Sequence, residues 1–112
     1  MKIVLNRCFG GFGLSDDAVL LYGEFAGIKL FKHFDMDDPY YPYWITAEGK
    51  PFFEYDIDRQ DPNLIKVVEQ LGEKANGRFA RLAVVEVPDD VDWKLTEYDG
   101  NEKIDEIHRS WP

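Results

Sequence analysis

Residues 2–15 read KIVLNRCFGGFGLS. The KIVLNR half carries apolar side chains on both faces of an extended chain, which predicts a central strand that is buried on both sides. The CFGGFGL segment that follows predicts a tight loop, because three of its residues are glycine. The closing Ser15 is a favourable N-cap, so we expect the chain to pass from strand through loop directly into a helix.

The rest of the chain continues this alternation of strands and helices. After the loop we expect, in order, a helix over 15–27, a strand over 28–34, a hairpin of 43–46 with 51–55, a helix that begins at Asp61-Pro62 and ends at Asn76-Gly77 or earlier at Gly72, strands over 81–87 and 92–98, and a short helix with Ile104, Ile107 and Trp111 on one face. This order predicts a single α+β domain over residues 1–112, with a mixed or antiparallel sheet of about 4–6 strands, two main helices and a short C-terminal helix.

Composition limits the class of protein. The chain has 112 residues, with 13 basic and 22 acidic side chains and a formal net charge of −9. The hydrophobic share of 45% and the aromatic share of 15% predict a folded domain and not a disordered chain. The net negative charge argues against direct binding to nucleic acid or to an anionic membrane surface. The absence of a signal peptide and of a long apolar run, together with the single Cys8, predicts a protein of the cytoplasm.

The loop after the first strand is the first candidate site. Backbone N–H groups of a glycine-rich loop next to a helix N-terminus can bind an anion, and the loop adds an arginine and two phenylalanines that could stack on a ring. The glycine spacing matches neither the dinucleotide-binding nor the phosphate-loop pattern, and Asp16 and Asp17 would repel an anion. The alternative is a tight loop whose phenylalanines fill the core. The candidate ligand-binding residues here are Asn6, Arg7, Phe9, Gly10, Gly11, Phe12 and Gly13.

Arg59 is the second candidate. It stands just before the helix that begins at Pro62, where it could hold a phosphate or a carboxylate through two parallel hydrogen bonds, or pair with Asp56 or Asp61. The alternating acids around it lack the glycine and the glutamate that a calcium loop of the EF-hand type requires. We therefore expect no calcium site.

The segment from Glu102 to Trp111 supplies the third candidate, His108 with Arg109. On a helix, Asp105 would lie one turn from both, which gives simple charge pairs on a solvated face or, alternatively, a general base and an oxyanion donor. The chain has only two histidines and one cysteine, which argues against a zinc site. We expect no metal and no cofactor.

The fourth candidate is the acidic and aromatic stretch over residues 35–55. The slightly longer segment 35–58 has seven acidic residues and a single base, Lys50, whereas residues 62–82 carry four bases and two acids. Tyrosines among carboxylates can engage a basic protein; the alternative is a loop that covers a sheet edge with its acids solvated. The candidate interaction residues are Asp35, Asp37, Asp38, Tyr40, Tyr41, Tyr43 and Trp44.

Several motifs resemble a family of small acidic proteins from bacteriophages and prophages. They are NRCFGGFGLS at 6–15, LGEKANG at 71–77, VPDDVDW at 87–93 and EYDG at 97–100, with His108, Arg109 and Trp111 beyond them. The resemblance carries over no catalytic or binding residue. It implies a protein made in the cytoplasm of a bacterial host, of the kind that antagonises host defence by sequestering a nucleotide signal or by blocking a protein complex, sometimes by mimicking DNA.

The sequence thus leaves three hypotheses. The first is a non-enzymatic phage-type protein that sequesters a small anionic ligand such as a nucleotide signal at Arg7–Gly13, with Arg59 and Arg109 adding charge. A homo-oligomer is compatible with this hypothesis, because the ligand site of a small domain can form between subunits. The second is an acidic inhibitor of a basic host protein. The third is a small hydrolase or phosphodiesterase that uses His108 with Glu102 or Glu106.

Overall fold

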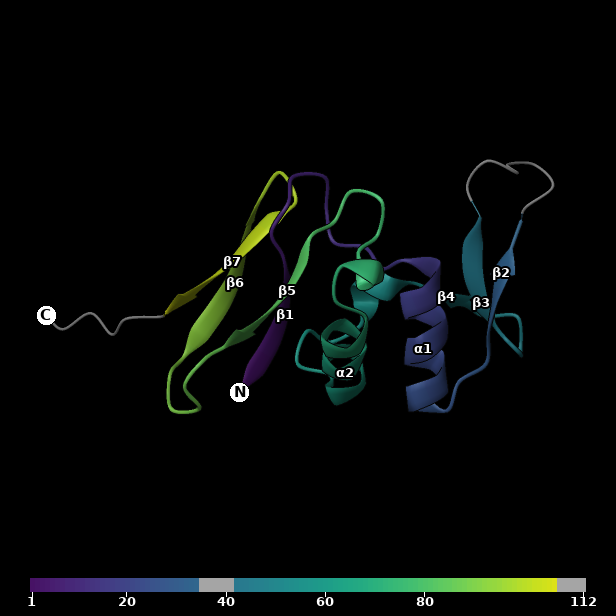
Figure 1. Cartoon of the computed structure of the whole chain (residues 1–112), viewed down its shortest axis with the longest axis horizontal. Coiled ribbons are helices and arrows are strands. Elements are labelled where there is room, and N and C mark those ends of the chain that lie inside the picture. The colour runs from purple at the N-terminus through teal and green to yellow at the C-terminus, as the bar shows by residue number, and fades with distance from the viewer. Residues whose placement is uncertain (35–41, 107–112) are drawn as a thin grey trace, which may run out of the picture.

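The structure is a computed structural model that describes residues 1–34 and 42–106. Within them the chain forms two α-helices and seven antiparallel strands in three small sheets (Figure 1). β1 (Lys2–Asn6) pairs with β5 (Leu82–Glu86), β2 (Leu30–His33) and β4 (Pro51–Phe52) flank β3 (Tyr43–Thr46), and β6 (Trp93–Tyr98) pairs with β7 (Asn101–Glu106). The α+β class is confirmed, but the strands form three sheets and not the single sheet expected.

The second edge of β1 explains why the sheets stay separate. The Val4 N–H donates to the backbone oxygen of Arg59 at 2.8 Å, and the Asn6 N–H donates to the carboxylate of Glu102, also at 2.8 Å. These acceptors occupy the hydrogen-bonding positions that a further strand would use. Because the edge is already satisfied, β1 pairs with β5 alone.

Both main helices begin where the sequence places them. α1 (Asp16–Ala26) is capped by the Ser15 hydroxyl, which accepts from the Ala18 N–H, and it ends at Gly27 in the left-handed conformation. α2 (Pro62–Leu71) is capped by the Asp61 carboxylate and ends early at Gly72. A short 3₁₀ turn, η2 (Gly72–Ala75), follows it. No helix in the described part of the chain is long and apolar enough to cross a membrane.

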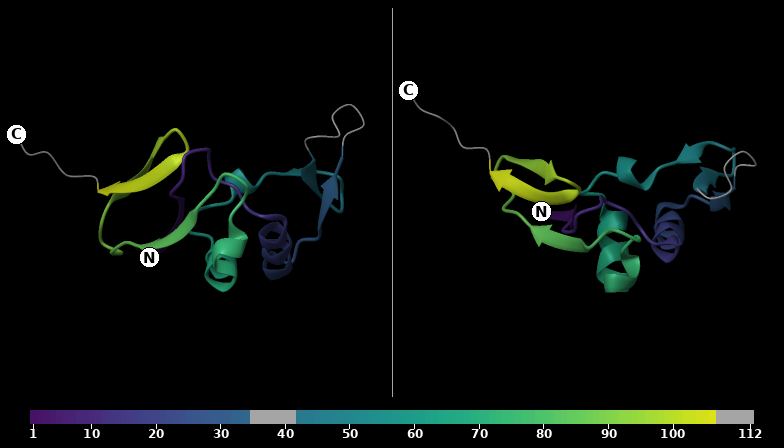
Figure 2. Two further views of the ribbon diagram at one scale, coloured as in Figure 1. Left: turned by 45° about the horizontal axis from the view of Figure 1, so that its top comes forward. Right: turned by 90° about the horizontal axis from the view of Figure 1, so that it is seen from above.

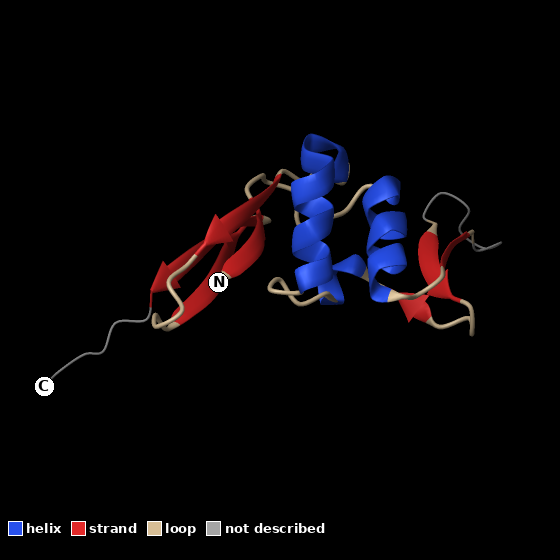
Figure 3. Ribbon diagram, turned by 60° about the horizontal axis from the view of Figure 1, so that its bottom comes forward, coloured by secondary structure: helices blue, strands red, loops and turns tan. Residues whose placement is uncertain are grey.

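β1 is buried on both faces, as its sequence predicts. Val4 faces the helices and belongs to the main core with Val19 of α1 and Leu64 of α2. Ile3 and Leu5 face the opposite way and form a second core against the β6–β7 hairpin. Figure 2 shows this hairpin packed over the β1–β5 pair, and Figure 3 shows the two helices between that part and the β2–β4 sheet. The molecule is therefore layered, with β1 between two cores.

The prediction of a C-terminal helix is wrong for the residues up to 106, where the described part of the chain ends. Residues 101–106 form β7, which pairs with β6 from Tyr98↔Asn101 to Trp93↔Glu106. The two-residue connection is Asp99-Gly100, and both residues have positive φ, 50° and 88°. An Asp-Gly pair of this geometry is the preferred two-residue turn of a β-hairpin. Ile107 and Trp111 lie outside the described residues.

The hairpin expected around residues 47–50 is confirmed, though its second strand is short. β3 pairs with β4 through Trp44↔Phe52 and Ile45↔Pro51. A 3₁₀ turn, η1 (Glu54–Asp56), then replaces the rest of the expected strand.

Candidate functional site

The glycine-rich loop docks onto the β6–β7 turn. The Gly10 N–H donates to the Asp99 oxygen at 3.0 Å. Gly100 is buried, and a Cβ atom there would overlap with the backbone of Gly10 and Gly11. On its other side the loop meets residues 77–79, because the Gly77 N–H donates to the Gly13 oxygen at 2.9 Å. Three chain segments that are distant in sequence thus meet at one end of the β1–β5 pair.

Asn6 holds these segments together. Its side chain is fully buried and donates to the oxygens of Cys8 at 2.8 Å and Gly100 at 2.6 Å, while its amide oxygen accepts from the Arg81 N–H at 2.9 Å. The amide nitrogen and the amide oxygen of Asn6 thus both have partners within the protein. Asn6 therefore positions the loop and does not itself face a ligand, in contrast to its expected role.

Arg59 is engaged in the same way, by an internal carboxylate. Its guanidinium makes two parallel hydrogen bonds to Glu102, at 2.5 and 2.9 Å, and stacks over the ring of Phe12, with 3.7 Å between the guanidinium carbon and the ring centre. The side chains of Arg59 and Glu102 are only 17% and 7% exposed. Arg59 does bind a carboxylate in fork geometry, as its position suggested, but the carboxylate belongs to β7. Phe12 packs against the main core, so both residues have contacts within the protein.

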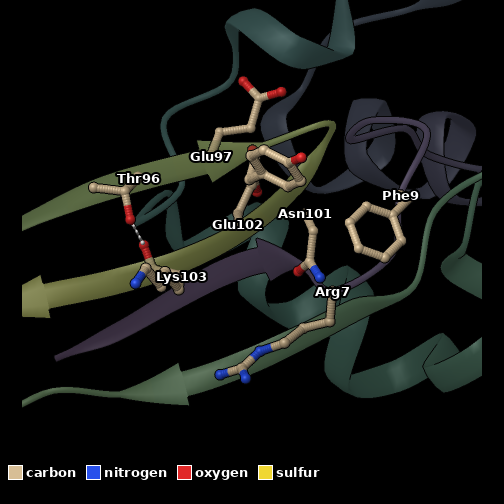
Figure 4. Close-up of a pocket in the computed structure, with 8 residues that line it drawn as sticks. Arg7, Phe9, Thr96, Glu97, Asn101, Glu102 and Lys103 are labelled. Atoms are coloured by element: carbon tan, nitrogen blue, oxygen red, sulfur yellow. Dashed lines mark hydrogen bonds between the residues drawn. The ribbon is translucent and has the colours of Figure 1, made fainter.

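A cavity of about 380 Å³ opens between the loop and the hairpin (Figure 4). The loop contributes Arg7 and Phe9, and the two hairpin strands contribute the remaining wall. That wall consists of Thr96, Glu97, Tyr98, Asn101, Glu102 and Lys103. We refer to this cavity as the arginine pocket.

Strand alternation directs Arg7 toward the arginine pocket. Successive side chains of a strand point to opposite faces, so Arg7 follows Ile3 and Leu5 on the face that packs against the hairpin. The Arg7 N–H donates to the Arg81 oxygen at 2.7 Å, which places Arg81 opposite Arg7 at the end of the β1–β5 pairing. Arg81 shares its face with Val85, which belongs to the same second core. Arg7 and Arg81 are thus exposed arginines at facing positions of the two strands, and Arg7 lines the pocket.

Two exposed aromatic rings flank the same opening. Phe9 and Tyr98 are 58% and 79% exposed, and their rings meet edge to face with 6.5 Å between centres and 81° between planes. Phe79, 62% exposed, contacts Gly10 from the neighbouring segment, and Arg78 lies over its ring at 5.2 Å. Exposed rings beside arginines provide surfaces on which a planar ligand can stack.

The carboxylates of the pocket have partners within the protein. Glu102 is compensated by Arg59. Glu97 accepts the Gly100 N–H at 2.8 Å and thereby caps the hairpin turn. The remaining charged side chains of the wall are Arg7 and Lys103, and Lys103 has only a long contact of 3.7 Å with Asp105. Among the described residues, Arg7 is therefore the cation of the wall that has no ion-pair partner, and Glu97 is the carboxylate that has none.

At the start of α1, where an anion site was expected, three backbone N–H groups already have acceptors within the protein. The Leu14 N–H donates to the Glu54 carboxylate at 3.3 Å, the Ser15 N–H to the Ala75 oxygen, and the Ala18 N–H to the Ser15 hydroxyl. Of the expected site residues, only Arg7 and Phe9 line the arginine pocket. Gly10, Gly11 and Gly13 shape the loop, and His108 and Arg109 lie outside the described residues.

The expected protein-interaction surface is described only in part. Asp35, Asp37, Asp38, Tyr40 and Tyr41 lie outside the described residues. Trp44 is 8% exposed and belongs to the main core, so it is not an exposed anchor. Tyr43 is half-buried, and its ring meets that of His33 edge to face.

Arg81, which pairs with Arg7, and Tyr98 and Lys103, which line the pocket, were not among the residues predicted from the sequence. One local signal could have found the last two, because Asp99-Gly100 between two polar-apolar stretches predicts a hairpin that brings its strands together. The pairing of Arg81 with Arg7 leaves no local signal. Among the described residues no cluster of three or more histidine, cysteine or acidic side chains could hold a metal ion. Comparison with protein-family models, with curated proteins and with solved structures finds no match.

Proposed function

We propose that this protein binds a small anionic ligand with an aromatic ring, of the nucleotide class, in the arginine pocket. One observation carries the proposal: Arg7 lines a cavity of about 380 Å³ and has a second exposed arginine, Arg81, opposite it in the strand pairing, although the chain has a net charge of −9. Small-molecule sites have volumes of about 300–1,000 Å³, and this cavity falls within that range.

The paired arginines favour an anion. Like charges directly opposite each other on neighbouring strands destabilise the pairing. Neither arginine makes an ion pair with any residue of the described part of the chain. A phosphate group would relieve this repulsion and would accept charge-assisted hydrogen bonds from both guanidinium groups.

The exposed rings favour a planar group on the same ligand. Phe9 and Tyr98 expose aromatic surface next to Arg7 at the pocket's opening. Stacking of a base on an aromatic side chain contributes about 1–3 kcal/mol. A phosphate held by the arginines together with a base on these rings accounts for both features of the site.

The biological role follows from the resemblance to small acidic phage proteins. In that setting the ligand would be a nucleotide signal of a bacterial defence system, and binding without turnover would withhold it. The hydrolase hypothesis has less support. Glu102, one of its two candidate bases, already accepts hydrogen bonds from Arg59 and from the Asn6 N–H.

Isothermal titration calorimetry tests the proposal with the four common 5′-mononucleotides, ribose 5-phosphate and adenosine. We expect at least one mononucleotide to bind more tightly than either fragment, because only the whole ligand engages both arginines and rings. Arg7→Ala and Arg81→Ala should each weaken binding about tenfold or more, since a hydrogen bond to a charged group contributes about 1.5–3 kcal/mol. Lys94→Ala, an exposed cation on β6 outside the pocket wall, serves as the matched control.

Two results would contradict the proposal. Binding of no mononucleotide, or equal binding by wild type and the Arg7→Ala/Arg81→Ala double variant, would exclude the arginine pocket as the site. Chromatography of the ligand after incubation separates sequestration from catalysis, because only an enzyme would convert it to product.

A further inference from the structure

A second cleft lies in another part of the molecule, between the start of α1 and the β2–β4 sheet. Its volume is about 290 Å³. The charged and exposed aromatic side chains of its lining, together with Tyr43, are Asp16, Lys32, Phe53, Glu54 and Tyr55. We refer to it as the Glu54 cleft, and it shares no lining residue with the arginine pocket.

Within residues 1–34 and 42–106, the Glu54 carboxylate has no cation paired with it. Its only described hydrogen bond from another residue is the one from the Leu14 N–H, at 3.3 Å. Lys32, the one cation of the cleft's described wall, is paired with Asp16 at 2.7 Å. Burial raises the pKa of Glu54, and the nearby Asp16 carboxylate raises it further. The adjoining sequence DMDDPYY over residues 35–41 contains no base that could neutralise it.

Aromatic rings also line the cleft next to Glu54. Phe53 and Tyr55 stack with 5.4 Å between ring centres and 20° between planes, and they are 42% and 62% exposed. Tyr43 faces the cleft from β3. The faces of such rings attract cations within about 6 Å of their centres. A carboxylate set among rings is therefore a receptor for an organic cation, most of all a planar guanidinium that stacks while it donates to the carboxylate.

We propose that the Glu54 cleft receives an arginine or lysine side chain presented by a basic protein segment, with Glu54 as its counter-ion and Phe53 and Tyr55 as its stacking surface. The charge of the surrounding sequence favours a protein segment over an isolated cation, because residues 35–58 hold seven acids and one base. The proposal refines the hypothesis of an acidic interaction surface: it replaces the buried Trp44 with the exposed rings at positions 53 and 55.

Proton linkage gives this site a signature of its own. A cation next to Glu54 favours the charged carboxylate, so binding must lower the pKa of Glu54 and must strengthen as pH rises through that pKa. Among the described residues, the other ionisable groups that line the cleft are Asp16 and Lys32, which are paired with each other, and the phenols of Tyr43 and Tyr55.

Calorimetry with a short arginine-containing peptide tests the proposal, and the same peptide with citrulline in place of arginine is the control. Citrulline keeps the shape of the side chain and removes its charge. We expect the citrulline peptide to bind about tenfold more weakly or worse, as is typical when a charge-assisted hydrogen bond is lost. Glu54→Gln should cause a similar loss, whereas Glu48→Gln, an exposed acid on the β3–β4 turn, should change binding less than about twofold.

Carboxyl-carbon NMR of the wild-type protein provides a second measurement that does not depend on any variant folding. The pKa of Glu54 should fall when the arginine peptide is added and should stay unchanged with the citrulline peptide. Equal affinity of the two peptides, or an unaltered Glu54 pKa at saturation, would overturn the proposal. Spermidine tests whether a free cation binds as well as a protein segment does. If spermidine bound as tightly as the peptide and lost as much affinity in Glu54→Gln, the assignment to a protein segment would be overturned.

Discussion

Replacement of Glu102 by alanine should destabilise the protein by about 3–4 kcal/mol. The change removes two hydrogen bonds to the Arg59 guanidinium and leaves the buried Asn6 N–H without an acceptor. Breaking a buried ion pair from one side costs about 3–5 kcal/mol. We expect the lower part of that range because 17% of the Arg59 side chain remains exposed and recovers some hydration.

Urea unfolding followed by tryptophan fluorescence measures this cost. A small domain has a denaturant slope of about 1–3 kcal/mol per molar urea, so the midpoint should fall by about 1 M or more. Glu69→Ala is the matched control. It breaks an exposed ion pair with Lys2, whose two side chains are 45% and 47% exposed, and it should cost less than about 1 kcal/mol.

A double replacement, Arg59→Met with Glu102→Leu, separates charge from packing. Apolar side chains of similar size remove both charges, so this variant should recover a large part of the lost stability. The reasoning would be refuted if Glu102→Ala were as stable as Glu69→Ala. A double variant no more stable than Glu102→Ala would show that the loss comes from packing and the Asn6 N–H, and not from an unpaired guanidinium.

Three further predictions follow from local geometry. Gly100→Ala should lower the free energy of unfolding by about 2 kcal/mol or more, because φ is +88° and the new Cβ would overlap with the glycine-rich loop; Gly49→Ala, with φ +82° and no atom within 4 Å, should lose only the backbone term of about 1 kcal/mol. Burial and the hydrogen bond to Asp61 raise the pKa of Tyr22 from 10.0 to about 12. An absorbance titration should therefore show one phenol that ionises at higher pH than the others, and Tyr22→Phe should remove it. The stability that Tyr22 contributes should be fully present below its unfolded pKa and should be lost as pH rises through its folded pKa. Glu54→Gln should leave thermal stability at neutral pH unchanged or raised, since burial raises the pKa of Glu54 and thus disfavours its charged form. As pH falls through that pKa, the stability of the wild type should rise relative to that of the variant. A clear destabilisation of the variant at neutral pH would contradict this prediction.

Sequence reasoning succeeded where a signal is local. Ser15 and Asp61-Pro62 mark helix starts because a cap needs only its next few residues, and both helices begin there. The apolar faces of residues 3–5 likewise predict a strand buried on both sides, which the structure confirms.

The C-terminal helix shows how local signals compete. Apolar residues at 104, 107 and 111 fit a helical face, but Asp99-Gly100 is a hairpin turn, and the pairing of six residues on each side decides the outcome. A two-residue Asp-Gly turn is thus a stronger indication of a hairpin than a helical spacing of three apolar residues is of a helix.

The site was beyond local reasoning for a different reason. Arg59 and Glu102 are 43 residues apart, and Asn6 and Gly100 are 94 apart. No spacing rule connects such residues, because only the assembled layers bring them together. Composition could indicate that unpaired arginines are unusual in an acidic chain, but it could not indicate that Arg59 has an internal partner whereas Arg7 lines a cavity.

The position of β1 between two cores has a consequence for how the molecule unfolds. One strand supplies Val4 to the helical side and Ile3 and Leu5 to the hairpin side, so neither side keeps its packing when β1 leaves. Its pairing partner, β5, lies some eighty positions further along the chain, as in Val4↔Val84. Contacts this distant in sequence slow folding. We therefore expect hydrogen exchange to report a single cooperative unit that spans the helices and the hairpin, with amides on both sides opening together.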